Sequence, residues 1–150
     1  MREDIAVALF NLISEITFAN PIMGQTTWQT ASRRLKLWGD VNPTDQPAVY
    51  VVEHEEKDEI NGRGLPPRRY MNFAIFAYFT LGDDTTIGGT FVNYIVDAIE
   101  AALTPNDVPG NIQNLDGLAY WCRIEGKIFK DPGDIDNQGM VIVPVLVLLP

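Results

Sequence analysis

The sequence is poor in the side chains that enzymes most often use for covalent or acid–base chemistry. Its 150 residues include one cysteine, Cys122, and one histidine, His54. A single cysteine excludes a disulfide within the chain and fits a reducing compartment. A nucleophilic triad would need Ser14, Ser32 or Cys122 beside that histidine. Ser14 falls in an expected helix and Ser32 begins an expected strand, so neither occupies a nucleophile turn. We therefore expect no catalytic residues and no enzymatic activity.

Positive charge and long apolar runs are also scarce. Lys and Arg number 11 against 20 Asp and Glu, a net charge of −9, so no broad basic face exists to bind nucleic-acid phosphates. The first four residues are too acidic for a secretory leader. The longest apolar run, residues 141–149, is interrupted by Pro144 and is far shorter than the roughly 20 residues of a membrane span. We expect a soluble protein with no membrane partner.

One short string begins like a zinc-binding helix motif. His54 is followed by Glu55 and Glu56, but Asp58 stands where the second histidine of that motif should be. The string also lies in a strand-like context rather than a helical one. We interpret His54 as a solvated residue at a strand end.

The segment 131–139 is the other candidate for a metal site. Asp131, Asp134 and Asp136 carry oxygens that suit a hard cation such as calcium. Their spacing is not that of a calcium-binding helix–loop–helix, and no glutamate closes the loop. The same residue types form turns between strands for backbone reasons. We expect a turn, with no metal ion and no cofactor.

Two segments show the apolar spacing of helices that cover a core. Residues 4–17 repeat apolar side chains at intervals of three and four, and Asn20-Pro21 ends the pattern. Residues 91–103 do the same between Gly88-Gly89 and Thr104-Pro105. Both segments are predicted to be amphipathic helices.

Five further segments are predicted to be strands because they alternate apolar with polar residues or are rich in β-branched side chains. They are residues 33–38, 48–53, 70–80, 118–129 and 139–149. Pro144 argues for an edge position or a bulge in the last one. We predict one α+β domain spanning residues 1–150, with a single mixed, mostly antiparallel sheet of about five strands and two helices packed mainly on one face.

Three of the predicted strands are apolar on both sides. Phe76 and Tyr78 oppose Phe73 and Phe79, and the last strand alternates two apolar sets. Two helices cover roughly one face of a five-stranded sheet. One apolar face is thus left without a cover, which on a soluble protein usually marks an interaction surface. We expect the chain to self-associate.

The segment 53–69 segregates its charges, with five acids preceding three arginines. We predict a loop of about fifteen residues, a length typical of functional or mobile connections. Separated charges suit docking to complementary protein surfaces. The candidate partner-binding residues are Arg33, Arg34, Glu55, Glu56, Arg63, Arg68, Arg69, Asp134 and Asp136.

Two stretches carry residues that occur together in a known family. One is Thr30-Ala-Ser-Arg-Arg-Leu-Lys-Leu-Trp38, continuing through Gly39 and Pro47 to Val51-Val-Glu-His-Glu55. The other runs from Leu118 through Ile124-Glu-Gly126, Asp131-Pro-Gly-Asp134 and Gln138-Gly139 to Val143-Pro-Val145. Together they resemble the tail terminator proteins of long-tailed bacteriophages, similar in plan to minor tail protein U. The predicted order of helices and strands matches that plan over nearly the whole chain.

The resemblance implies a structural virion protein that forms a homo-oligomeric ring, hexameric in that family. Such a ring assembles in the host cytoplasm, sits on the last ring of major tail tube protein, ends tube polymerisation and presents a docking surface for the head–tail connector. The genome DNA passes through the lumen without specific binding, a role that suits an acidic protein. A head-completion or stopper protein is the nearest alternative. A metal-dependent enzyme built on Asp131, Asp134 and Asp136 and a monomeric adaptor are alternatives of other classes.

Overall fold

The computed structural model describes residues 1–107 and 109–150. Within them the chain forms two α-helices, α1 (Arg2–Ser14) and α2 (Gly88–Ala102), together with a curled β-sheet. The predicted α+β class is confirmed. Both helices begin two or three residues earlier than the apolar spacing indicated and end one to three residues sooner.

The main sheet has the strand order β3-β4-β5-β8-β6, with β7 also paired to β8 beside β6. Its strands are β3 (Thr30–Ser32), β4 (Ala48–Glu59), β5 (Arg68–Thr80), β6 (Trp121–Ile124), β7 (Phe129–Asp131) and β8 (Gln138–Leu148). The β3–β4 pair is parallel and the remaining pairs are antiparallel, so the sheet is mixed and mostly antiparallel as predicted.

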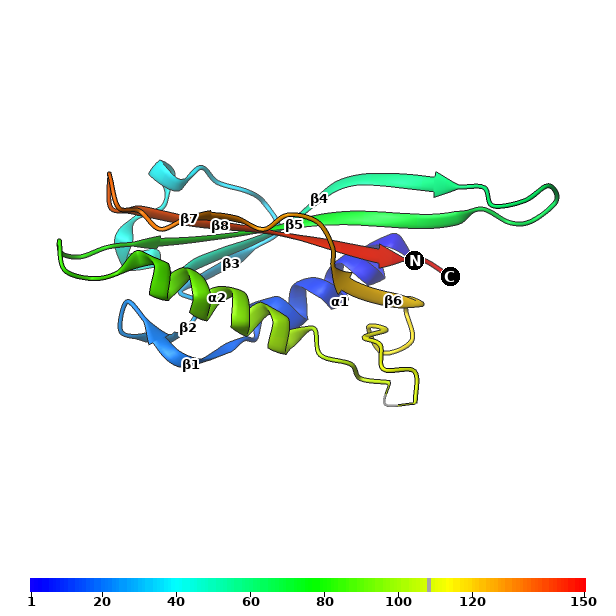
Figure 1. Ribbon diagram of the computed structural model, residues 1–150, viewed down its shortest axis with the longest axis horizontal. Coiled ribbons are helices and arrows are strands. Elements are labelled where there is room, and N and C mark those ends of the chain that lie inside the picture. The colour runs from blue at the N-terminus through cyan, green and yellow to red at the C-terminus, as the bar shows by residue number, and fades with distance from the viewer. Residues whose placement is uncertain (108) are drawn as a thin grey trace.

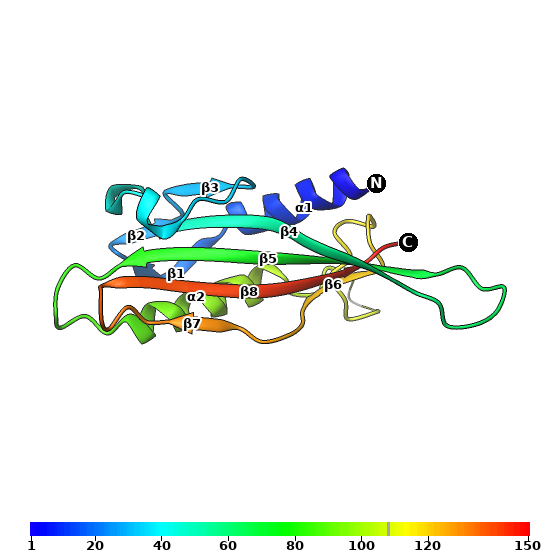
Figure 2. The same ribbon diagram turned by 90° about the horizontal axis from the view of Figure 1, so that it is seen from above.

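One face of this sheet is closed by the helices. Figure 1 shows α1, α2 and a small hairpin on the same side of the sheet, and Figure 2 shows α2 passing beneath β8 while α1 runs along the β4 edge. The buried residues of α1 and α2 join Phe73, Ile75 and Val143 in one apolar cluster. Each of these three strand residues is at most 2% exposed. A fully buried side chain of this size contributes about 1.5–3 kcal/mol, so this face supplies most of the stability.

The small hairpin consists of β1 (Thr17–Ile22) and β2 (Gln25–Thr27), which the sequence patterns missed. Asn20-Pro21 was interpreted as a helix stop, but the chain continues through it as an edge strand. Trp28 follows the hairpin, and its indole N–H donates to the carbonyl of Ile13 at 2.9 Å. The bond uses one of the carbonyls left free at the end of α1, and thereby fixes the hairpin to that helix.

The predicted strand 33–38 is wrong. On this side of β4, only β3 pairs with it in the described part of the chain. Residues 33–47 then leave the sheet edge and cover one end of the sheet face opposite the α-helices, through two short 3₁₀ helices, η1 (Trp38–Asp40) and η2 (Pro43–Asp45). The Tyr78 hydroxyl donates to the carbonyl of Lys36 at 2.7 Å, and the Trp38 indole donates to that of Phe79 at 3.2 Å. Alternation of Leu35 and Leu37 misled the prediction, because both side chains are exposed.

The predicted strand 118–129 is divided into β6 and β7, and the edge position predicted for β8 is wrong. β8 has β5 on one side and, on the other, β6 and β7, each of which pairs with a different part of β8. The carbonyl of Pro144 accepts from Glu125 N–H, so the missing N–H of the proline points into the break between β6 and β7, where no ladder bond is required. Gly126 bends over this point with φ of 122°. The proline is therefore tolerated in an inner strand.

Neither α1 nor α2, the two helices of the described residues, is long and apolar enough to cross a membrane.

The start of α2 depends on a close approach between two backbones. A methyl group added to Gly88 would overlap the carbonyl oxygen of Pro132, whereas the nearest atom to one added at Gly89 is 4.0 Å away. We expect Gly88→Ala to lower the free energy of unfolding by at least 2 kcal/mol, because backbone must move. Gly89→Ala should raise it by about 0.5–1 kcal/mol through helix propensity. Urea denaturation of both variants measures this; equal effects would contradict the packing described.

Candidate functional site

The most distinctive surface feature is a hairpin arm formed by the far ends of β4 and β5. The last partner of β8 in β5 is Tyr70, which pairs with Leu148. Beyond that point Leu149, which follows β8, donates one more backbone bond to the carbonyl of Arg69 at 2.9 Å, while β4 and β5 continue through Asp58↔Arg69 and Glu59↔Arg68 to the tip at residues 60–67. The arm projects past the body of the molecule (Figures 1 and 2). At about 3.3 Å per residue it extends roughly 15 Å beyond the sheet.

The arm corrects the prediction of a fifteen-residue loop over 53–69. The loop is confined to residues 60–67, and the rest is paired strand. Both faces of the arm are polar, so its residues give no apolar alternation by which a strand could be recognised. Cross-strand pairs of opposite charge support it instead, as in the 3.6 Å contact between Arg69 and Asp58.

The tip of the arm combines exposed apolar and basic side chains. Ile60 is 75% exposed and Leu65 is 60% exposed. Arg63 and Arg68 are exposed beside them. The neighbouring β4 strand is acidic, so charge changes sign across the arm. An exposed apolar tip on a protruding element is typical of a segment that inserts into another surface.

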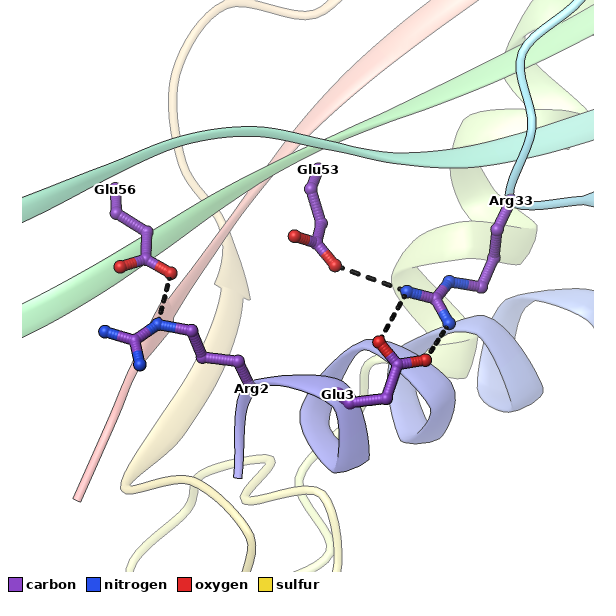
Figure 3. Close-up of polar contacts among 5 residues, drawn as sticks. All are labelled: Arg2, Glu3, Arg33, Glu53 and Glu56. Atoms are coloured by element: carbon purple, nitrogen blue, oxygen red, sulfur yellow. Dashed lines mark hydrogen bonds and ion pairs between the residues drawn. The ribbon is translucent and has the colours of Figure 1, made fainter.

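The root of the arm is fixed to the body by ion pairs (Figure 3). Arg33 donates to both carboxylate oxygens of Glu3 on α1, and also to Glu53 on β4 at 3.2 Å. Arg2 donates to Glu56 at 2.7 Å. The hydrogen bonds from Arg33 lower the pKa of Glu3, and the bond to Glu3 raises the pKa of Arg33. Because the pKa of Glu3 is lower in the folded than in the unfolded chain, its ion pair stabilises the fold at pH values above the ordinary pKa of glutamate. This contribution is lost as the pH falls through the lowered pKa.

The candidate partner-binding residues therefore differ in availability. Arg33, Glu56 and Arg69 are engaged within the chain. Four others, Arg34, Glu55, Arg63 and Arg68, are exposed on the arm or near its root. Asp134 and Asp136 lie at the opposite end of the sheet, in the β7–β8 turn, so the nine residues do not form one site.

The second face of the sheet is covered only at one end. There Val41 and Trp38 pack on Tyr50 and Tyr78, whose rings lie 5.6 Å apart. The Tyr50 hydroxyl is buried with no hydrogen-bond partner among the described residues, and burial raises its pKa. Segment 33–47 thus acts as a partial cover, which shortens the uncovered face that the sequence predicted.

The remainder of this face, which we call the open face, is an apolar strip with no cover from the described residues. Its members are half-buried and come from β4, β5, β6 and β8. They are Val52, Tyr70, Ala74, Phe76, Trp121, Ile142, Pro144, Leu146 and Leu148. A hollow of about 420 Å³ lies over Phe76, Ile142 and Pro144, with Lys127 and His54 among the residues that line it. At the arm end Arg123 stacks on Trp121, 4.0 Å from the ring centre.

A larger hollow, which we call the helix groove, lies on the other side of the molecule between α1, β1 and α2. Its volume is about 610 Å³. Leu12, Ile16 and Tyr94 contribute apolar surface, together with alanines of α2, and Glu15 and Asp97 contribute carboxylates. Neither helix has a basic residue in its last turn. The groove is therefore apolar inside and negative at its margin.

The described residues bring together no cluster that would support acid–base or nucleophilic chemistry. Burial raises the pKa of Cys122 to about 12, which removes the thiolate a nucleophile requires. In the described part of the chain, no three His, Cys, Asp or Glu side chains are placed to hold a metal ion. The carboxylates of Asp131 and Asp136 accept backbone N–H bonds from Gly133 and Gln138, which is the chemistry of a turn.

Among known proteins, no protein-family model matches the chain, and no curated protein matches it.

The ion pairs at the arm root predict that Arg33 holds the first turn of α1 against β4. Arg33→Gln should accelerate amide hydrogen exchange in the first turn of α1, because Glu3 and Glu53 lose their shared partner. The neighbouring Arg34→Gln is the control and should leave exchange unchanged, since Arg34 is exposed. Wild-type protein should show the same local loosening as the pH falls below the range in which glutamate ordinarily titrates and Glu3 becomes protonated, because the pKa of Glu3 is lowered in the fold. Identical exchange in both variants would refute this role.

Proposed function

We propose that this protein is a non-enzymatic structural subunit that self-associates into a ring at the head-proximal end of a bacteriophage tail tube. There it ends tube polymerisation and provides the docking surface for the head connector. The observation that carries the proposal is the open face, an apolar strip on one side of the sheet that the chain's own elements leave half-buried. The resemblance of residues 30–55 and 118–145 to tail terminator proteins supports the choice of ring and location.

The energetics favour association over a monomer. Each half-buried leucine or phenylalanine that becomes fully buried contributes about 25 cal/mol per Å² of apolar surface removed from water. The open face presents nine half-buried residues across several strands, among them Phe76, Leu146 and Leu148, so a partner that covers it gains several kcal/mol before the cost of association. Arginine and tryptophan at one end of the strip, in contact at 4.0 Å, are the residue types that most often dominate interface energy.

The charge of the chain supports a passage for DNA. A net charge of −9 repels phosphate, so a ring of such subunits would let a genome move without binding it. Six copies would carry six times that charge. The bases that exist are concentrated on the arm and near its root, where protein partners can reach them.

The proposal predicts control of tube length. Purified protein added to polymerising tail tube subunits should yield shorter tubes that carry a ring at one end, as seen by negative-stain electron microscopy. Tubes of unchanged length and without end rings would contradict the proposal. In particles assembled without the protein, overlong tails would agree with it, whereas finished tails of normal length that lack heads would favour a stopper of the connector.

The open face predicts a variant that folds but assembles poorly. Leu146→Glu places a charge in the middle of the strip, where it stays solvated in the monomer but would be buried in an interface. We expect self-association to weaken at least tenfold by sedimentation velocity, with an unchanged melting temperature. Ile135→Glu is the matched control, because Ile135 is 100% exposed in the β7–β8 turn. If both variants assemble equally well, the open face is not part of the interface.

A further inference from the structure

We propose that the tip of the hairpin arm inserts into the helix groove of a second copy of this chain. The inference deepens the proposed function, since it rests on self-association and names the surfaces that meet. The arm donates apolar side chains and arginines, and the groove receives them between α1, β1 and α2. Neither feature is used by the fold itself.

The tip presents its apolar side chains to solvent and away from the body of its own molecule. Ile60 and Leu65 are 75% and 60% exposed, an arrangement that costs solvation unless a partner covers them. The two strands behind the tip are held in register by Asp58↔Arg69 and Glu59↔Arg68. The tip is therefore presented on a paired, relatively stiff support, which lowers the entropy lost when it docks.

The groove offers the complementary surface. Leu12, Ile16 and Tyr94 supply an apolar floor, and alanines of α2 keep it open. Glu15 and Asp97 are exposed at its margin. Among the described residues that line it, none is a lysine or arginine, so the negative charge at this site is not balanced locally.

The helix dipoles make the same end of the groove more negative. Its lining includes the last turn of α1 and the last turns of α2, where the helix dipole places about half a negative charge per helix. Helices usually place Lys, Arg or His in this position, but neither α1 nor α2 does. A guanidinium from outside, such as that of Arg63 or Arg68, would be attracted by both the carboxylates and the helix dipoles.

The arm cannot reach the groove of its own molecule. The arm root contacts the first residue of α1, where Arg2 bonds Glu56, whereas the groove lies at the last turn of the same helix. A helix of 13 residues separates the two by roughly 20 Å. The arm also points away from the body in both views (Figures 1 and 2). The contact must be made between copies.

The other hollows suit the tip less well. The one on the open face is lined by Lys127 and His54 as well as Glu53, and Glu53 is already bonded to Arg33. The hollow between the arm and the C-terminal end of β8 is lined by Pro66, Pro67 and Arg68 of the arm and by Tyr120, Trp121 and residues 148–150 of the same chain, so arm residues already form one of its walls. Of these three hollows in the described part of the chain, the helix groove is the one that combines apolar walls with carboxylates that no lysine or arginine of its lining balances.

An arm-to-groove contact is directional, because the two surfaces lie on different parts of the chain. Each copy gives one arm and receives another, so the contact is heterologous and closes into a ring when the rotation between copies permits. A contact made by the tip of one hairpin buries a small area, and small interfaces are at the weak end of protein–protein interactions. Ring closure and the open face would add to it.

Charge reversal in two chains tests the proposal. The arm variant carries Arg63→Glu and Arg68→Glu, and the groove variant carries Glu15→Arg and Asp97→Arg. Each should self-associate at least tenfold more weakly than wild type by sedimentation velocity. An equimolar mixture should recover assembly, because each kind of arm then meets a groove of opposite charge, and rings in the mixture should alternate the two variants.

Two further variants control for folding and for charge alone. Replacing residues 60–67 with Asn-Gly keeps the Glu59↔Arg68 pair, closes the arm with a favoured two-residue turn and should abolish the contact. Asp84→Arg combined with Lys130→Glu reverses two exposed charges outside the groove, the tip and the open face, and should assemble as wild type does. Melting temperatures establish that every variant is folded.

The outcomes separate this inference from the proposed function. Arm and groove variants that assemble like wild type, or a mixture of two folded, non-assembling variants that stays monomeric, would overturn the arm-to-groove contact while leaving ring formation intact. A wild-type chain that stays monomeric at high concentration and also on tail tubes would overturn both.

Discussion

The pairing of β5 on both sides is the constraint on which the rest of the structure depends. β5 lies between β4 and β8 along nearly its whole length, which fixes its alternate residues to opposite faces. Phe73, Ile75 and Phe79 are thereby buried against α1 and α2, while Ala74 and Phe76 point to the other side. A one-residue slip would exchange the two sets. One register therefore creates both the closed core and the open face.

The same strand pair also places the features proposed for assembly. β4 and β5 extend further than β8, so their ends form the arm. α1 runs from the arm root to the helix groove, so the length of this helix sets the distance between the arm and the groove. The ion pairs of Arg33 and Arg2 fix that geometry at its root. The proposed association surfaces thus arise from unequal strand lengths. Folding and the proposed self-assembly would share one framework.

Sequence patterns succeeded where burial is one-sided and failed where it is absent. Helices and the strands 48–53, 70–80 and 139–149 were predictable because their apolar residues repeat with a regular period and face a core. The arm has no buried face, so its strands left no such signal and were interpreted as a loop. Segment 33–38 shows the reverse case, since its alternation is genuine but its leucines meet solvent. Periodicity reports a pattern of side chains, not a pairing partner.

The sequence by itself determined the α+β class and the surplus of apolar surface on the sheet. These properties depend on amino-acid composition and on the spacing of apolar residues along the chain, and both can be determined without knowing which residues are in contact. Only the tertiary structure decided how segment 33–47 covers part of the second face, how β8 became an inner strand despite Pro144, and where the arm and the helix groove lie. Those features depend on contacts between residues far apart in the chain, and a local pattern carries no record of them.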